Sequence, residues 1–503
     1  TSEKKLLKEG LSTQSEYKWK VQAVQSDGGT AVSNEATFAT VNHKVLRYSQ
    51  AGEFQAGYDS IGAAVAAASD GDVIKAQGGE TFTNETAQIE ISGLELKITS
   101  TDQRAVTLDM SGDATRAFYI SDGASVTLQR FVVTNCSITG ADGGALFLTG
   151  TSPTLTTLDA TFSSNGTDGN GGAIFLDKEV YYFARNTVVT GNQAASGGGM
   201  CLFAVNTNSP NPTFISRNST FSHNEASEME NFYGGGGGVH ARYGTFSASE
   251  TFFVHNTSTM AGGLYILNSR GGMENSVVSY NTASMWAGGM MLFNPVTLED
   301  AFLCKDSEFS YNEASTENAW GGGIALAQGA LVTDGCSIFS NSNPDGYGGG
   351  VALPGYVSGE ADYFAIDTQI WGNQALSGGG ICVMSATFTA VSNVSISGNT
   401  AGTGGGISLG AAGTIYAEEM DVFNNSAQDG GGLYWGDTVD PSDEQNTEIF
   451  TNGNPWTPPQ SLENPFSVGL DGSIHTTPVV GDPVQFYGDT AVSTENELLY
   501  LAF

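Results

Sequence analysis

Apolar and polar residues repeat through most of the chain with a period of about 29 residues. In each copy an apolar residue stands three positions before an asparagine, and a glycine run follows 5–12 residues after that asparagine. The repeat occurs eleven times, and its asparagines are Asn135, Asn165, Asn192, Asn224, Asn256, Asn281, Asn312, Asn341, Asn373, Asn399 and Asn425. We expect these asparagines to have one shared structural role.

A short segment with a two-residue period follows each glycine run. Its first and third residues are apolar in every copy, from Leu146 and Leu148 in the first to Leu433 and Trp435 in the last. Because successive side chains of a strand point to opposite faces, this pattern predicts one buried strand face per repeat.

A repeat of this length cannot bury a core alone, so its copies must stack. The strands alternate with Gly, Asn and Ser rather than with helical segments, which argues against leucine-rich and ankyrin arrays. We therefore predict an all-β fold, a right-handed parallel β-helix of about 13–14 coils over residues 46–436. Stacked asparagines would form an amide ladder along one corner of the coils. Such a corner requires a left-handed backbone conformation, which asparagine tolerates.

The flanks of the repeat region differ from it. Residues 58–79 predict a short amphipathic cap helix, a turn and the first strand, and a helix over the open end would protect it from aggregation. Residues 437–503 hold seven of the thirteen prolines and predict a C-terminal cap or linker, with late strands near 484–489 and 497–503. We expect residues 1–42 and 437–503, which flank the predicted β-helix, to be partial β-sandwich-like segments.

Two resemblances to known families accompany these patterns. Residues 1–42 resemble the last two strands of a fibronectin type III domain, with Tyr17 and Trp19 at matching positions. The motifs DGGALF (142–147) and NGGAIF (170–175) resemble the repeat of chlamydial polymorphic outer-membrane proteins. That resemblance implies a pectin-lyase-like β-helix and a secreted surface adhesin carried by a C-terminal autotransporter barrel. The last 67 residues are too few for such a barrel, so we expect no direct membrane insertion.

The charge is strongly negative and unevenly spread. The chain has 53 acidic and 18 basic residues, a net charge of −35, and residues 271–503 contain 27 acids with Lys305 as their one base. Such a surface repels phosphate backbones, so nucleic acid and anionic membranes are poor partners. We expect an extracellular or cell-surface protein without a resident cofactor, although diffuse Ca²⁺ binding suits scattered carboxylates.

The five cysteines do not form the pattern of a disulfide framework or a zinc site. Cys304 and Cys336 fall on successive coils, about three residues or ~10 Å out of register at ~3.3 Å per residue. That separation exceeds the ~7 Å limit between the Cα atoms of a disulfide. We predict no intrachain disulfide.

The chain lacks the sequence motifs of a polysaccharide-cleaving enzyme of this fold. Polysaccharide lyases of this fold need basic residues beside a calcium-binding Asp cluster, to neutralise a uronate and accept its proton. The bases of the earlier coils stand in no such motif, and they are Arg104, Arg116, Arg130, Lys178, Arg185, Arg217, Arg242 and Arg270. His223 and His255 each precede a repeat asparagine, and we expect them to stack on adjacent coils, either as a metal pair or in a permissive surface position.

The outward residues of the strands after the glycine runs are mostly apolar, which is unusual for a solvated face. The candidate contact stripe consists of Phe147, Phe175, Tyr265, Met291 and Tyr434. Either long inserts such as 203–220 or 354–366 cover it, or it contacts another subunit or a glycan.

Seven sequons permit N-glycosylation, at Asn84, Asn135, Asn165, Asn218, Asn256, Asn393 and Asn424. Our leading hypothesis is a non-catalytic structural or assembly module of a surface or filament protein, whose partners are its own copies or other surface proteins. The second is an adhesin module that binds a host protein or glycan. The third is a polysaccharide lyase or hydrolase.

Overall fold

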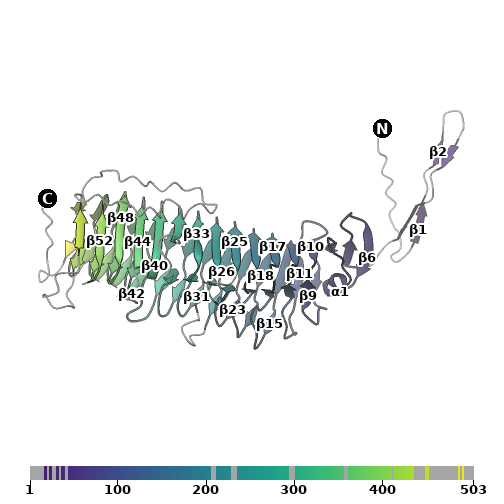
Figure 1. Ribbon diagram of the computed structural model, residues 1–503, viewed down its shortest axis with the longest axis horizontal. Coiled ribbons are helices and arrows are strands. Elements are labelled where there is room, and N and C mark those ends of the chain that lie inside the picture. Colours follow the sequence, from purple (N-terminus) through teal and green to yellow (C-terminus); the bar gives the residue numbers. More distant parts are fainter. Residues whose placement is uncertain are drawn as a thin grey trace.

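The computed structural model describes the side chains of residues 43–205, 211–227, 235–293, 301–355, 361–410 and 412–435, and the backbone of seven short strands outside these ranges. The chain forms a rod of stacked strands (Figure 1). This is the parallel β-solenoid that the repeat predicts.

Four strands make one turn of the solenoid. They are β16 (Leu146–Thr149), β17 (Thr154–Leu158), β18 (Thr161–Ser163) and β19 (Gly166–Thr167), and we call their ladders faces 1, 2, 3 and 4. The next turn places one further strand on each ladder, parallel and in register.

The number of complete turns is lower than predicted. Face 3 contains 14 strands, from β8 (Thr81–Phe82) to β57 (Gln485–Tyr487), whereas face 4 contains 12, from β15 (Ser137–Ile138) to β58 (Thr490–Ala491). Taken together, the four ladders make a solenoid of about eleven turns. The expected 13–14 coils therefore include partial turns at the two ends. The late strand predicted near 484–489 includes β57, and the one predicted at 497–503 lies outside the described residues.

The core runs along the rod axis. The apolar strand pairs predicted from the repeat are buried from Leu146 through Leu409. The last pair differs from the prediction, because Leu433 is half-buried and Trp435 is 46% exposed at the last described turn of face 1. Phenylalanines of neighbouring turns also stack inside, as Phe221 and Phe253 do with ring centroids 5.3 Å apart.

The solenoid begins with antiparallel pairing. Strand β5 (Val45–Tyr48) pairs antiparallel with β6 (Phe54–Tyr58) and with β7 (Val73–Ala76), and β7 starts face 2. Helix α1 (Ile61–Ala66) lies between β6 and β7 in the chain and contacts all three strands. The parallel ladder thus starts from strands of the opposite direction.

Two polar groups hold the start of α1. The Ser60 hydroxyl accepts a hydrogen bond from the Ala63 amide at 3.1 Å. The buried Glu85 carboxylate accepts hydrogen bonds from the Ile61 and Gly62 amides. Burial raises the pKa of Glu85, and those amide hydrogen bonds oppose the shift.

An antiparallel hairpin precedes the solenoid. Strand β1 (Glu16–Trp19) pairs with β4 (Ala36–Ala39), and β2 (Gln22–Val24) pairs with β3 (Thr30–Val32). Its assignment to a fibronectin type III domain stays a prediction.

Candidate functional surfaces

The repeat asparagines form a continuous ladder inside the corner between faces 3 and 4. Each side-chain amide nitrogen donates to the Oδ1 of the next asparagine at 2.9–3.0 Å. The same Oδ1 accepts the backbone amide of the preceding asparagine at 2.9–3.1 Å. The Nδ2 also donates to a backbone carbonyl one turn back, as Asn256 does to Phe221. An interior asparagine of the ladder therefore has both its donors and both its acceptor positions satisfied.

Ten of the eleven predicted asparagines belong to this ladder, and Asn135 does not. The ladder position of its turn is Cys136, whose backbone amide donates to Asn165 Oδ1 at 3.1 Å. Asn135 is exposed and donates to Asp109 instead. It occupies the corner one residue before the ladder, where the backbone φ is +58°.

We predicted that the ladder asparagine itself adopts the left-handed conformation of the corner. In the structure, the residue immediately before each ladder asparagine adopts it instead. That position is Ser164, His223, His255, Tyr280, Tyr311, Ser340 or Asn424 in seven turns, with φ between +53° and +57°. Glycine fills it in three more turns, at Gly191, Gly372 and Gly398. The ladder asparagine is selected by its amide hydrogen bonds, whereas the corner accepts several residue types.

The glycine runs pack against the ladder. A Cβ on Gly263 would lie 2.7 Å from the Gly289 carbonyl oxygen and 3.0 Å from the Asn281 Nδ2. Any side chain there would displace backbone or an amide of the ladder. The two most regular motifs of the sequence, asparagine and glycine, therefore serve one packing interaction.

The asparagine and glycine motif of one turn also matches a known protein family. Residues 159–177 match the Chlamydia polymorphic membrane protein repeat. The matched segment runs from the corner at Asp159 through β18 and Asn165 to the glycine run and β20 (Ile174–Leu176). No curated protein and no solved structure matches the chain. The polymorphic membrane protein repeat and the solenoid together agree with the resemblance that the sequence motifs indicated.

The predicted contact stripe on face 1 is largely covered. Phe175, Tyr265 and Met291 are only 2–4% exposed, and Phe147 and Tyr434 are half-buried. Tyr265 and Met291 belong to a second apolar cluster with Met260, Ala261 and Ala287, which stand before or in the glycine-run segments. These segments lie against the outer side of the strands that follow them. Three of the five stripe residues are thus buried and two are half-buried, so the described part of the stripe is not an open contact surface.

The first turns of face 1 carry an aromatic row instead. The rings of Tyr119 and Phe147 stack with centroids 5.5 Å apart, and Phe147 and Phe175 stack at 5.1 Å. The Arg116 guanidinium lies over Phe147 at 4.8 Å from the ring centroid. Burial lowers the pKa of Arg116, and stacking on the ring compensates part of the desolvation.

The buried ionisable groups of the core are held neutral. Burial lowers the pKa of His240 to about 3, and the ring bonds to Ser196 through Nδ1 at 2.7 Å. Burial raises the pKa of Cys136, Cys336 and Cys382 to about 12, so these thiols are unreactive at neutral pH.

All five cysteines are free. Cys304 pairs in register with Thr333, three residues before Cys336, as the repeat predicted. The turn at Gly335 nevertheless brings the Cys336 sulfur within 3.2 Å of the Cys304 carbonyl oxygen. The extended-strand estimate of ~10 Å neglected this turn.

The two histidines stack on adjacent turns, as expected. Ring centroids of His223 and His255 lie 5.0 Å apart, and the row continues through Tyr280 and Tyr311. These residues lie at the left-handed corner, where Tyr280 is 50% and Tyr311 46% exposed. Over the described ranges, no three His, Cys, Asp or Glu side chains converge as a metal-binding group. We call this row the corner aromatic ladder.

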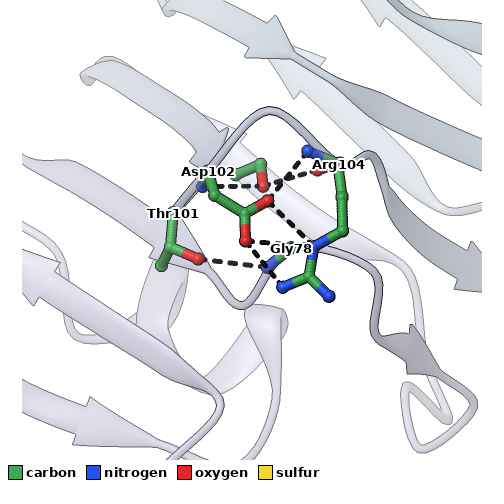
Figure 2. A network of polar contacts seen from close by, with 5 residues as sticks. Gly78, Thr101, Asp102 and Arg104 are labelled. Carbon is green, nitrogen blue, oxygen red and sulfur yellow. Dashed lines mark hydrogen bonds and ion pairs between the residues drawn. The ribbon is translucent and has the colours of Figure 1, made fainter.

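Figure 2 shows a polar network near the start of the rod, in the turn between β10 (Glu95–Ser100) and β11 (Val106–Asp109). Arg104 Nη2 donates to Asp102 Oδ2 at 2.6 Å, and the Arg104 amide donates to Oδ1 at 2.8 Å. The guanidinium lowers the pKa of Asp102. All these bonds fix the turn, and we assign the network a structural role.

Burial divides the seven sequons. Asn165 and Asn256 are ladder residues, 2% and 0% exposed, so a glycan cannot be attached to them in the folded chain. The exposed sequon asparagines are Asn84, Asn135, Asn218, Asn393 and Asn424. Their occupancy stays a prediction. In the described part of the chain, no helix has the length and hydropathy of a membrane span.

Proposed function

We propose that the chain is a rod-shaped, non-catalytic module of a cell-surface protein, with a structural or assembly role. The match to the polymorphic membrane protein repeat supports the surface location. Eleven turns rising about 4.8 Å each give a rigid body roughly 50 Å long. Such a body separates the segments at its two ends and presents long, regular side faces.

One observation carries the structural role: the most repeated residues of the chain are buried. The ladder asparagines are at most 2% exposed, and their amides bond to one another. What repeats on every turn is therefore scaffold, whereas the exposed positions differ from turn to turn. A solenoid whose repeated residues are buried keeps a constant shape, while its exposed residues can vary from turn to turn.

The test is electron microscopy of the purified chain at rising concentration, with and without calcium. We expect rods of constant diameter that associate into filaments or sheets. Single rods under every condition would reject the assembly role. For the surface location, intact cells that make the whole protein are treated with protease, and loss of the rod from the cells is the expected result.

An adhesin is the second candidate, because the corner aromatic ladder is exposed. Tyr280 and Tyr311 are 50% and 46% exposed, and their rings stack on neighbouring turns. Exposed tyrosines of this kind are frequent in binding surfaces. Host-cell binding that falls after Tyr280→Ser and Tyr311→Ser, with unchanged thermal stability, is the result that would favour this role.

A further inference from the structure

One stretch of face 2 lacks carboxylates although the chain is strongly acidic. It spans β13 (Ser125–Gln129), β17, β21 (Tyr181–Arg185), β25 (Thr213–Arg217) and β29 (Thr245–Ser249), which lie side by side along the rod (Figure 1). Three residues of each strand point outward, and none of these fifteen is Asp or Glu. We call these outward positions the face 2 platform.

The platform is mostly hydroxyl-bearing, with an apolar centre. Serine or threonine occupies eight of the fifteen outward positions. Tyr181 is 41% exposed, and Phe183 and Ile215, which pair across neighbouring strands, are each 38% exposed. Neither of the two aromatic rings stacks on another ring within the described residues. They differ in this from the rings of face 1 and of the corner aromatic ladder.

Two arginines stand together at one side of the platform. Arg185 and Arg217 are paired in register on β21 and β25, and both are exposed. Neighbouring strands lie about 4.8 Å apart, and like charges on adjacent strands repel. Within the described part of the chain, neither guanidinium forms an ion pair or a hydrogen bond. A chain with 53 acidic residues thus leaves two adjacent cations without a carboxylate.

We propose that the face 2 platform binds a polysaccharide that carries carboxylate groups. The arginine pair supplies planar, bidentate donors for the carboxylates. Tyr181 and Phe183 offer ring faces to the apolar side of the sugar rings, and the serine and threonine hydroxyls can exchange hydrogen bonds with sugar hydroxyls. The lack of carboxylates on the platform removes the repulsion that the rest of the surface exerts on an anion.

This binding goes beyond the structural role of the rod and does not depend on it. The platform belongs to the earlier turns, whereas residues after Arg270 contain one basic residue, Lys305. A rod that binds an acidic glycan through its first half can still assemble, or fail to assemble, through other surfaces. The two proposals can therefore fail separately.

The test measures binding of the full chain to immobilised alginate, a linear polyuronate, with dextran as the uncharged control. We expect binding to alginate only, weakened by added salt. The double variant Arg185→Gln and Arg217→Gln should lose at least tenfold in affinity, and Phe183→Ser several-fold. Arg104→Gln, which also removes one exposed positive charge, should leave the affinity unchanged.

Thermal unfolding of each variant checks that it is folded, and we expect midpoints equal to that of the parent because these side chains are exposed. Equal binding to alginate and dextran, or an affinity that the double variant keeps, would overturn the proposal. Sedimentation of the same samples decides the remaining case. If the double variant alters self-association and not alginate binding, the platform is an interface between copies, and the glycan proposal is wrong.

Discussion

The asparagine ladder and the face 2 platform both run along the rod, and each turn contributes residues at equivalent positions. The two differ in whether the same residue type returns from turn to turn. Inside the corner, the same residue returns on ten successive turns and every amide group is bonded. On the platform, the residue paired in register with Phe183 is Ile215 on one side and Thr156 on the other. The arginine pair likewise occupies only two turns.

This difference separates scaffold from surface. Each interior Oδ1 of the ladder accepts two hydrogen bonds from the asparagine one turn before, so an apolar residue in its place would leave two buried donors unpaired. An outward residue has water as an alternative partner, so each turn can carry a different side chain. In this solenoid, the residues that repeat from turn to turn stabilise the fold. Exposed residues whose charge or polarity differs from the rest of the surface are the candidates for function.

The sharpest test of that contrast removes one amide from the middle of the ladder. Asn281→Ala would leave the backbone amide and the Nδ2 of Asn256 without their acceptor. Two buried unpaired donors should lower the free energy of unfolding by about 4 kcal/mol in denaturant titrations. Asn135→Ala is the matched control, since this residue has the same sequence motif but stands outside the ladder. A loss of similar size in both variants would contradict the assignment.

A second test enlarges the residue that faces the ladder. Gly263→Ala places a methyl group 2.7 Å from the Gly289 carbonyl oxygen and 3.0 Å from Asn281 Nδ2. We expect the free energy of unfolding to fall by about 3 kcal/mol, because backbone or the ladder must move. Gly166→Ala is the control, where the nearest atom is 3.6 Å away. Equal stability of the two variants would show that the glycine run can be replaced.

Acid should lower the free energy of unfolding through His240, which is buried on the covered side of face 1. Its pKa falls from 6.5 to about 3 on folding, so the unfolded chain binds a proton that the folded chain does not, and stability decreases as the pH falls through this window. At pH 5 the loss from this group is about 2 kcal/mol. The variant His240→Phe removes the titrating group and keeps a ring against Tyr265. Thermal unfolding at pH 7 and pH 5 should show a smaller difference for the variant than for the parent.

The smallest effect is expected at the exposed turn of Figure 2. Asp102→Asn removes the ion pair with Arg104, but both side chains are solvated and the pair is screened by salt. We expect no measurable shift in the midpoint of thermal unfolding. A clear decrease would mean that this turn contributes to the start of the solenoid more than its exposure indicates.

Much of the architecture was predictable because the spacing of the repeat shows which residues of successive turns lie side by side. The apolar pairs after each glycine run predicted the inward residues of face 1 from Leu146 to Leu409. The same pattern could not predict what lies over the outer side of those strands. Tyr265 and Met291 are outward by alternation, but the segments before the glycine runs fold back onto that face. Strand periodicity reports direction relative to the sheet, and not whether a second layer covers it.

The platform illustrates a signal that was present but not used. Arg185 and Arg217 each stand seven residues before a ladder asparagine, Asn192 and Asn224, and this equal offset places them in one register. Taken singly, each arginine is an ordinary exposed base. Only counting from the ladder shows that two positive charges are adjacent.

By itself, the sequence determined that this protein is a stacked all-β solenoid, since a short apolar repeat with Asn and Gly has no other way to bury its strands. It also determined the acidic character of the surface. The tertiary structure decided which asparagine of each motif enters the ladder, which sequons remain accessible, and that the apolar outer row of face 1 is covered. These outcomes depend on contacts between turns about 29 residues apart and on how loops fold over a face, and no local pattern specifies either.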